Sequence, residues 1–235
     1  MKPLIIVTGG TKGIGRAILE RFAKGGFDGL VCARTDEDLR QLARDFAGQF
    51  PENNLQTFPA DLADRAGVDA LVSFIQTQNR PVDVLINNAG TFRPGQIHNE
   101  EEGTFEAVMA TNVQSAYHLT RGLVGAMMAR RRGYIVNICS TASIMAYTNG
   151  GSYCISKYAL LGLSRVLRED LKPYGVKVTA VLPGATLTDS WAESGLPPER
   201  FMLPQDVAEV VWTSFALSPG AVVEEILMRP QLGDI

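Results

Sequence analysis

The sequence has few residues that could build a metal centre, a disulfide framework or a nucleic-acid interface. Its 235 residues include three cysteines, Cys32, Cys139 and Cys154, and two histidines, His98 and His118. The cysteines are far apart and lie beside apolar runs, so we expect reduced core thiols, and no pair has the spacing of zinc ligands. The formal net charge of −3 excludes the broad positive field that nucleic acids and anionic membranes attract.

Long hydrophobic runs, repeats and low-complexity tracts are also missing. The first apolar run, Leu4–Thr8, is too short for a signal peptide or a membrane span. We therefore expect a cytoplasmic protein whose partners are small molecules. Hydrophobic residues make up 46% of the chain and charged residues 20%, which is ordinary for a globular protein with a sizeable core.

Short runs rich in Val, Ile and Leu alternate with stretches of helical period, which is typical of βαβ units around a parallel sheet. The runs predict buried strands at Leu4–Thr8, Leu30–Ala33, Leu55–Pro59, Val82–Asn87, Tyr134–Ile138 and Val176–Leu182. The stretches predict helices at Ile14–Lys24, Asp36–Gly48, Asp64–Gln78, Glu102–Arg130, Ser152–Pro173 and Pro204–Leu217. We expect an α/β fold, a doubly wound parallel sheet with helices on both faces, in one domain spanning residues 1–235.

Two segments invite more local predictions. Arg130, Arg131 and Arg132 precede Gly133, so we expect cations at a helix C-terminus followed by a glycine stop. The segment Gly184–Leu203 has no clear period, and an irregular loop of that length in a compact domain is usually functional. We expect it to act as a substrate lid.

A glycine-rich turn follows the first predicted strand. Gly9, Gly10, Gly13 and Gly15 supply four glycines in seven positions, whereas a plain tight turn between a strand and a helix needs only one. Gly9 can turn the chain out of the strand, and Gly13 and Gly15 allow the backbone to approach a pyrophosphate at the helix N-terminus. The turn predicts a dinucleotide site.

The second predicted strand ends without the carboxylate that binds the ribose diol of NAD. Arg34 stands there instead, and with Lys12 from the glycine turn it could hold a 2′-phosphate. We therefore expect NADP(H) in preference to NAD(H). In the alternative interpretation, Arg34 is a solvated side chain whose charge interacts with the acids at positions 36–38.

Tyr153 and Lys157 lie four residues apart at the start of a predicted helix, on the same face and one turn apart. A neighbouring ammonium favours the phenolate, so such a tyrosine can exchange protons near neutral pH. Ser140 directly follows a predicted strand, and Asn88 and Asn112 come from the same rim of the sheet. These side chains converge where doubly wound sheets bind ligands.

In this order the motifs closely resemble those of the short-chain dehydrogenase/reductase family. They are Thr8-Gly9-x-x-x-Gly13-x-Gly15, Asp61, Asn87-Asn88-Ala89-Gly90, Asn112, Ser140, Tyr153-x-x-x-Lys157 and Pro183-Gly184 with Thr188. The resemblance implies a seven-stranded Rossmann fold, a nicotinamide cofactor, and a homodimer or homotetramer that associates through Glu102–Arg130 and Ser152–Pro173.

The resemblance also assigns roles. It makes Tyr153 the acid that protonates a carbonyl oxygen, Ser140 the hydrogen-bond donor to that oxygen, Lys157 the group that holds the nicotinamide ribose, and Asn112 the support of a water in the proton relay. The expected cofactor contacts are Thr8, Gly9, Thr11, Lys12, Gly13, Ile14, Gly15, Arg34, Asp61, Leu62, Asn88, Ala89, Gly90, Tyr153, Lys157, Pro183, Gly184 and Thr188.

The sequence predicts an NADPH-dependent carbonyl reductase that acts on a ketone or diketone. Candidate substrate contacts are Ile144, Met145, Tyr147 and Trp191, each of which could instead be core packing.

The C-terminal residues 222–235 are similar to those of bacterial sepiapterin-reductase-like members, and a 3-oxoacyl-carrier-protein reductase is a further possibility. A non-catalytic NADP(H)-binding sensor and an NAD-linked alcohol dehydrogenase remain as rivals. No Gly-x-Ser-x-Gly elbow supports a hydrolase.

Overall fold

The computed structural model describes residues 1–191 and 194–235. Its strands are β1 (Leu4–Thr8), β2 (Asp28–Ala33), β3 (Leu55–Pro59), β4 (Val84–Asn87), β5 (Gly133–Ile138), β6 (Val176–Pro183) and β7 (Glu225–Met228). Its helices are α1 (Gly13–Lys24), α2 (Asp36–Gln49), α3 (Arg65–Thr77), α4 (Thr104–Met109), α5 (Ser115–Arg130), α6 (Gly151–Leu171) and α7 (Pro204–Ala216). The strands form a seven-stranded parallel sheet in the order β3-β2-β1-β4-β5-β6-β7. The predicted doubly wound α/β fold is confirmed.

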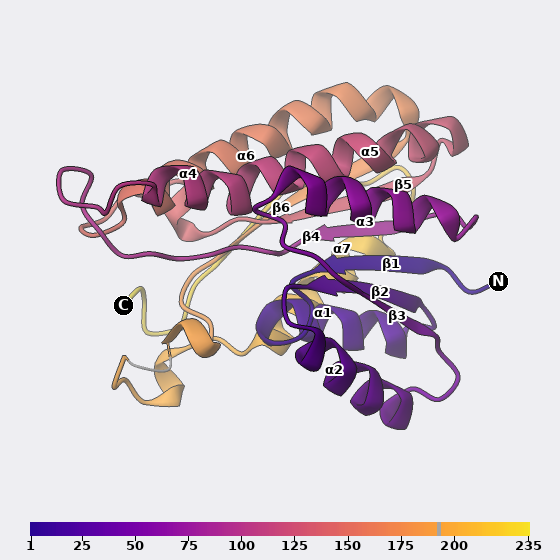
Figure 1. Ribbon diagram of the computed structural model, residues 1–235, viewed down its shortest axis with the longest axis horizontal. Coiled ribbons are helices and arrows are strands. Elements are labelled where there is room, and N and C mark those ends of the chain that lie inside the picture. The colour runs from indigo at the N-terminus through magenta and orange to yellow at the C-terminus, as the bar shows by residue number, and fades with distance from the viewer. Residues whose placement is uncertain (192–193) are drawn as a thin grey trace.

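Helices cover both faces of the sheet (Figure 1). Along β1, Ile5 and Val7 pack into a core shared with α1, α2 and α7. Leu4 and Ile6 point the other way, into a core shared with α3 and α5. Successive side chains of a strand point to opposite faces, so a strand buried on both sides must be apolar throughout. This explains why the strands read as continuous apolar runs in the sequence.

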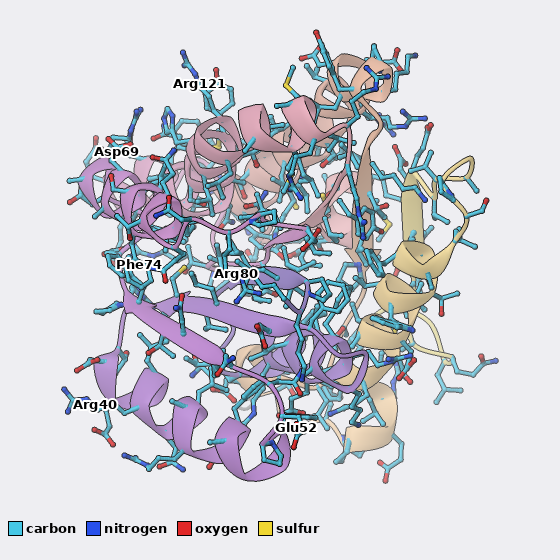
Figure 2. All side chains as sticks on the ribbon, turned by 90° about the vertical axis from the view of Figure 1, so that its right-hand side faces the viewer. Arg40, Glu52, Asp69, Phe74, Arg80 and Arg121 are labelled. Atoms are coloured by element: carbon cyan, nitrogen blue, oxygen red, sulfur yellow. The ribbon has the colours of Figure 1, made fainter. Side chains whose placement is uncertain are left out.

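The outer surfaces of the helices are polar. Arg40 on α2, Asp69 on α3 and Arg121 on α5 are exposed and lie on the outside of the molecule (Figure 2). Within residues 1–191 and 194–235, no helix combines the length and the apolar character needed to cross a lipid bilayer. The three cysteines are buried and free, as expected.

Strand boundaries differ from the predictions where a polar group is buried with a partner. β2 begins at Asp28 rather than Leu30, because the Asp28 carboxylate is paired with Arg80 at 3.0 Å and so can be buried. β7 was not predicted from the hydrophobic pattern. It is a short edge strand beside β6, and its Glu225 and Leu227 are exposed. Half of its residues are therefore exposed, and the sequence shows no continuous apolar run there.

The prediction of one helix over Glu102–Arg130 is wrong. The helix begins at Thr104, and a π-helical turn at Ala110–Gln114 separates α4 from α5. The side chain of Asn112 within this turn is buried and bonds to the backbone of Thr91. A tertiary contact of this kind can hold an extra residue in a helical turn, and such bulges occur frequently at functional sites.

The predicted glycine stop after α5 is also wrong. Arg131, with φ of 52°, takes the left-handed conformation that ends the helix. The amide of Arg132 donates to the carbonyl of Met127 at 3.2 Å, which satisfies a terminal carbonyl. Gly133 instead opens β5, where an added Cβ would lie 2.7 Å from the Met127 sulfur. The glycine is needed for packing.

In the expected lid, Gly184–Leu203, the structure describes residues 184–191 and 194–203, and positions 192–193 lie outside the described residues. Thr186 forms a β-bridge with Met202, and short 3₁₀ turns occur at Asp189–Trp191 and Pro198–Arg200. The bridge holds the two ends of this segment together, so its described part is not an irregular loop.

Candidate active site

The carboxyl ends of the parallel strands surround a cavity of about 640 Å³. Loops after β1, β4, β5 and β6 contribute to its wall, so it lies where the strand order reverses between β1 and β4. The predicted site residues that line it are Gly9, Thr11, Lys12, Gly13, Ile14, Arg34, Asp61, Leu62, Asn88, Ala89, Gly90, Ser140, Met145, Tyr147, Tyr153, Lys157, Pro183, Gly184, Thr188 and Trp191. Thr8, Gly15, Asn112 and Ile144 lie outside this wall.

The glycine turn after β1 depends on backbone conformations that suit glycine. Gly9 has φ of +64° and Gly13 has φ of +56°, both in the left-handed region. Gly15 also packs closely against the loop after β4. A Cβ there would lie 2.5 Å from the Asn88 side-chain nitrogen and 2.6 Å from the carbonyl oxygen of Gly9. Gly15 thus makes room for Asn88 behind the cavity.

Thr8 and Asn88 fasten the glycine turn to the loop after β4. The Thr8 hydroxyl accepts hydrogen bonds from the amides of Asn88 and Ala89, both at 2.9 Å. The side-chain amide of Asn88 donates to the carbonyls of Thr8 and Gly9, both at 2.9 Å. Two walls of the cavity are therefore held together by the buried Thr8 and the half-buried Asn88.

The cavity wall contains both cations and carboxylates, namely Lys12, Arg34 and Lys157 with Asp38, Asp61, Asp189 and Asp234. Arg34 is exposed there, while Asp36 pairs with Arg40, and Glu37 pairs with Arg44 at 3.2 Å. Two of the acids that could have neutralised Arg34 thus have other partners. The Lys12 ammonium lies 2.6 Å from the Asp189 carboxylate, and this contact raises the pKa of Lys12. Both side chains are exposed, so solvent screens the pair.

Tyr153 and Lys157 line the cavity from the first turns of α6. The Lys157 ammonium is buried, donates to the carbonyl of Ile138 at 2.9 Å and lies 5.7 Å from the centre of the Tyr153 ring. The ring of Phe92 meets the Tyr153 ring edge-on, with 4.9 Å between ring centres. The phenol is therefore held between an apolar ring and a buried cation.

Asn112 lies directly behind these residues. Its side-chain oxygen accepts from the amide of Thr91 at 2.8 Å, and its nitrogen donates to the Thr91 carbonyl at 3.0 Å and to the Ser156 hydroxyl at 2.9 Å. Ser156 in turn donates to the carbonyl of Tyr153 at 2.7 Å. Asn112 thereby connects the π-helical turn, the loop after β4 and the first turn of α6.

Ser140 caps the short turn that follows β5. Its hydroxyl oxygen accepts a hydrogen bond from the amide of Ala142 at 3.1 Å. The oxygen is the acceptor in this bond, so the hydroxyl proton can be donated into the cavity.

Aromatic and sulfur-containing side chains form the remaining wall. Met145, Tyr147 and Trp191 line it, as predicted, together with Phe92. Ile144 is 42% exposed and lies outside the cavity. Partial burial raises the pKa of Tyr147, so its hydroxyl is a neutral hydrogen-bond donor near neutral pH.

Sequence reasoning missed several lining residues, among them Phe92, Asp189, Asp234 and Ile235. Phe92 stands two positions after Gly90, so its place beside a functional motif was a usable signal. Asp234 and Ile235 reach the cavity because the chain after β7 folds back, where Arg229 pairs with Asp234. No local pattern predicts that return.

Comparisons with known proteins agree with this geometry. The sequence model of the short chain dehydrogenase family matches residues 3–197. A sepiapterin reductase of Chlorobaculum tepidum is 32% identical, and the alignment covers 100% of this chain and 99% of that protein. An NADP-dependent 3-hydroxy acid dehydrogenase of Salmonella typhimurium is 30% identical over 97% of this chain and 94% of its own length. A metagenomic short-chain oxidoreductase, solved in complex with NADP, has a TM-score of 0.85 at 29% identity and 97% coverage of both chains.

Proposed function

The chain belongs to the short-chain dehydrogenase family and is an NAD(P)-dependent oxidoreductase, and from this premise we propose that it is an NADPH-dependent carbonyl reductase. The proposal assigns it hydride transfer to a ketone or diketone, with Tyr153 as the proton donor. One observation carries the proposal: Ser140, Tyr153 and Lys157 line the same cavity as the glycine turn and Arg34. The acid Tyr153, the cation Lys157 and the glycine turn proposed to bind the dinucleotide therefore line the same cavity.

The cavity suits a nicotinamide dinucleotide in shape and charge. Helix α1 has no acidic residue in its first turn and no side-chain cap from Lys12, so its N-terminal amides and dipole can attract a phosphate. At Gly90, a Cβ would lie 3.4 Å from the Asn112 oxygen and 3.7 Å from the Lys157 nitrogen. A side chain there would fill the space in front of the catalytic lysine.

Recognition of NADP(H) is assigned to Arg34, with Lys12 as a second cation. The guanidinium fork suits a 2′-phosphate, and the exposed ammonium of Lys12 acts as a point charge. Asp61 and Leu62 also line the cavity, as expected for contacts to the adenine half. The NADP complex of the metagenomic relative supports this assignment.

The cofactor supplies the hydride to the carbonyl carbon. Tyr153 transfers its hydroxyl proton to the carbonyl oxygen as negative charge develops there. The nearby Lys157 ammonium stabilises the phenolate that remains. The Ser140 hydroxyl donates a hydrogen bond to the same oxygen, and this bond strengthens in the transition state.

Asn112 lies behind Tyr153 and Lys157 and supports the proton path there. Both of its amide hydrogens are engaged, one by Thr91 and one by Ser156. A relay water beside Asn112 would therefore bind to an acceptor oxygen and not to the amide nitrogen.

A carbonyl screen that follows NADPH absorbance tests the proposal. The panel includes ketones, diketones, acetoacetyl thioesters and sepiapterin, the last because of the similarity to a sepiapterin reductase. We expect Tyr153→Phe to bind NADPH normally and to lose at least about 10²-fold in kcat, since general acid catalysis contributes about 10²–10⁴-fold.

Tyr174→Phe is the matched control. Tyr174 lies in the turn after α6, does not line the cavity and is 39% exposed, so the same loss of a hydroxyl should leave kcat unchanged. If Tyr153→Phe keeps most of its activity, Tyr153 is not the proton donor. Tight NADPH binding without any turnover would favour the sensor alternative.

A further inference from the structure

The helix that carries Tyr153 and Lys157 has no cap from its own sequence. Helix α6 has 21 residues, its N-cap is Gly150, and neither a side-chain cap nor an acidic residue occurs in its first turn. The first amides of a helix need acceptors, and an uncapped first turn frays more readily. Tyr153 lies in this first turn.

A carboxylate from another part of the chain caps the helix instead. The Oε1 atom of Glu100 accepts a hydrogen bond from the backbone amide of Ser152 at 2.8 Å, and Oε2 accepts from the Ser152 hydroxyl. Glu100 is 52 residues away in sequence and belongs to the loop between β4 and α4. Its negative charge also stands at the positive end of the helix dipole.

The backbone around this contact is closely packed. A Cβ at Gly151 would lie 1.9 Å from Oε1 of Glu100, and a Cβ at Gly95 would lie 2.6 Å from Cγ of Glu100. Both glycines allow the carboxylate to reach the helix end. The position of Glu100 is thus determined by close packing on two sides.

The loop that carries Glu100 is fastened to the residues before α6. Gly95 forms a parallel β-bridge with Gly150, and its amide donates to the carbonyl of Asn149 at 3.0 Å. The Gln96 side chain donates to that of Asn149 at 3.0 Å. The same loop also carries Phe92, whose ring contacts the Tyr153 ring.

We propose that Glu100 is a positioning residue: by capping α6 at Ser152 it fixes the hydroxyl of Tyr153 against the carbonyl oxygen of the substrate. The inference rests on the function proposed above. Lys157 lies one turn further on and has its own anchor at the carbonyl of Ile138. Loss of the cap therefore displaces the proton donor more than it affects the lysine that holds the cofactor.

The test compares Glu100→Ala with Glu101→Ala. Glu101 is an exposed carboxylate in the same loop, so both variants lose the same charge, but only the first loses the cap. We expect Glu100→Ala to reduce kcat by about tenfold or more with little change in the Kd of NADPH, since a displacement of about 1 Å can cost about 10²-fold. The primary isotope effect with 4-deuterated NADPH should rise, because the chemical step becomes rate-limiting.

Glu100→Gln keeps an oxygen that can accept from the Ser152 amide. We expect this variant to recover most of the lost activity. If Glu100→Ala does not fold, Glu100→Asp takes its place, because its side chain is one methylene too short to hold the same contact with Ser152. A purely structural role would lower Tm without changing the isotope effect or the ratio of kcat to cofactor affinity. Equal kcat values for Glu100→Ala and Glu101→Ala would overturn the proposal.

A readout that needs no turnover separates this inference from the proposed function. With NADPH bound, amide hydrogen exchange in the segment 150–157 should be faster in Glu100→Ala than in Glu101→Ala. Equal exchange rates would overturn the role of Glu100, whatever the activity. If the wild-type protein reduces no carbonyl, but exchange is still faster in Glu100→Ala than in Glu101→Ala, only the proposed function is refuted.

Discussion

We propose that single residues determine the preference of the cavity for NADP(H) over NAD(H). Arg34 and Lys12 both line it, and no carboxylate follows β2 at the position where one would bind the ribose diol of NAD. Asp36 and Glu37 follow Arg34 in sequence but pair with Arg40 and Arg44. Asp38, the third acid in the alternative interpretation of Arg34, lines the cavity together with Arg34, so cofactor binding has to decide between the two interpretations.

Arg34→Ala should weaken NADPH binding much more than NADH binding. A hydrogen bond to a charged group contributes about 1.5–3 kcal/mol, so the Kd of NADPH should rise by about tenfold to a hundredfold at about 1.4 kcal/mol per factor of ten. Titration of protein fluorescence with each cofactor measures both constants. Arg132→Ala, an exposed arginine just before β5 that does not line the cavity, is the control, and equal affinities of the wild-type protein for NADPH and NADH would contradict the assignment.

Some residues of the site could be found from the sequence because the backbone or the spacing demands them. Gly9 and Gly13 require positive φ, and Tyr153 and Lys157 lie at helical spacing. Glu100 could not be found, because its function arises from a contact 52 residues away. Likewise, Asp234 reaches the cavity only through the return of the chain after β7.

At the scale of elements, the break between α4 and α5 brings Asn112 into the site. The π-helical turn Ala110–Gln114 places the Asn112 side chain, 1% exposed, against Thr91 and Ser156. Helical periodicity predicted one continuous helix here, since α4, the π-helical turn and α5 follow one another with no non-helical residue between them. Arg131 shows the same limit: tertiary packing, and not propensity, selected a non-glycine residue for the left-handed position.

Asn112→Ala should reduce both stability and turnover. The substitution removes the side-chain partners of the Thr91 amide and carbonyl, and each unsatisfied buried group costs about 1–3 kcal/mol. Urea unfolding measures the change in the free energy of unfolding, and steady-state assays with a carbonyl substrate measure kcat. Gln114→Ala, exposed in the same turn, is the control. If both variants behave alike, the contacts of Asn112 do not support the site.

At the scale of the whole molecule, α5 and α6 lie side by side in the helical layer on one face of the sheet (Figure 1), and both carry exposed apolar side chains. Tyr117, Ile155, Tyr158 and Val166 are 45%, 40%, 46% and 58% exposed. Exposed apolar groups gathered on neighbouring helices are typical of an interaction surface. We propose that this layer is where copies of the chain associate.

We expect a homodimer or homotetramer that Val166→Glu dissociates. A buried, unpaired carboxylate is costly, so the charge should shift the equilibrium towards monomers. Light scattering coupled to size-exclusion chromatography gives the mass of each variant. Leu217→Glu adds the same charge at the end of α7, in the opposite helical layer, and should leave the mass unchanged. A wild-type monomer at micromolar concentration would contradict the proposal.

A crystal structure of the protein with NADP⁺ and an unreactive ketone analogue tests the central claim most directly. The account predicts the Tyr153 hydroxyl within about 3 Å of the carbonyl oxygen, at hydrogen-bond distance, with Ser140 contacting the same oxygen and the nicotinamide facing the carbonyl carbon. A Tyr153 ring that points away from the nicotinamide, with no space for a ketone between them, would contradict it.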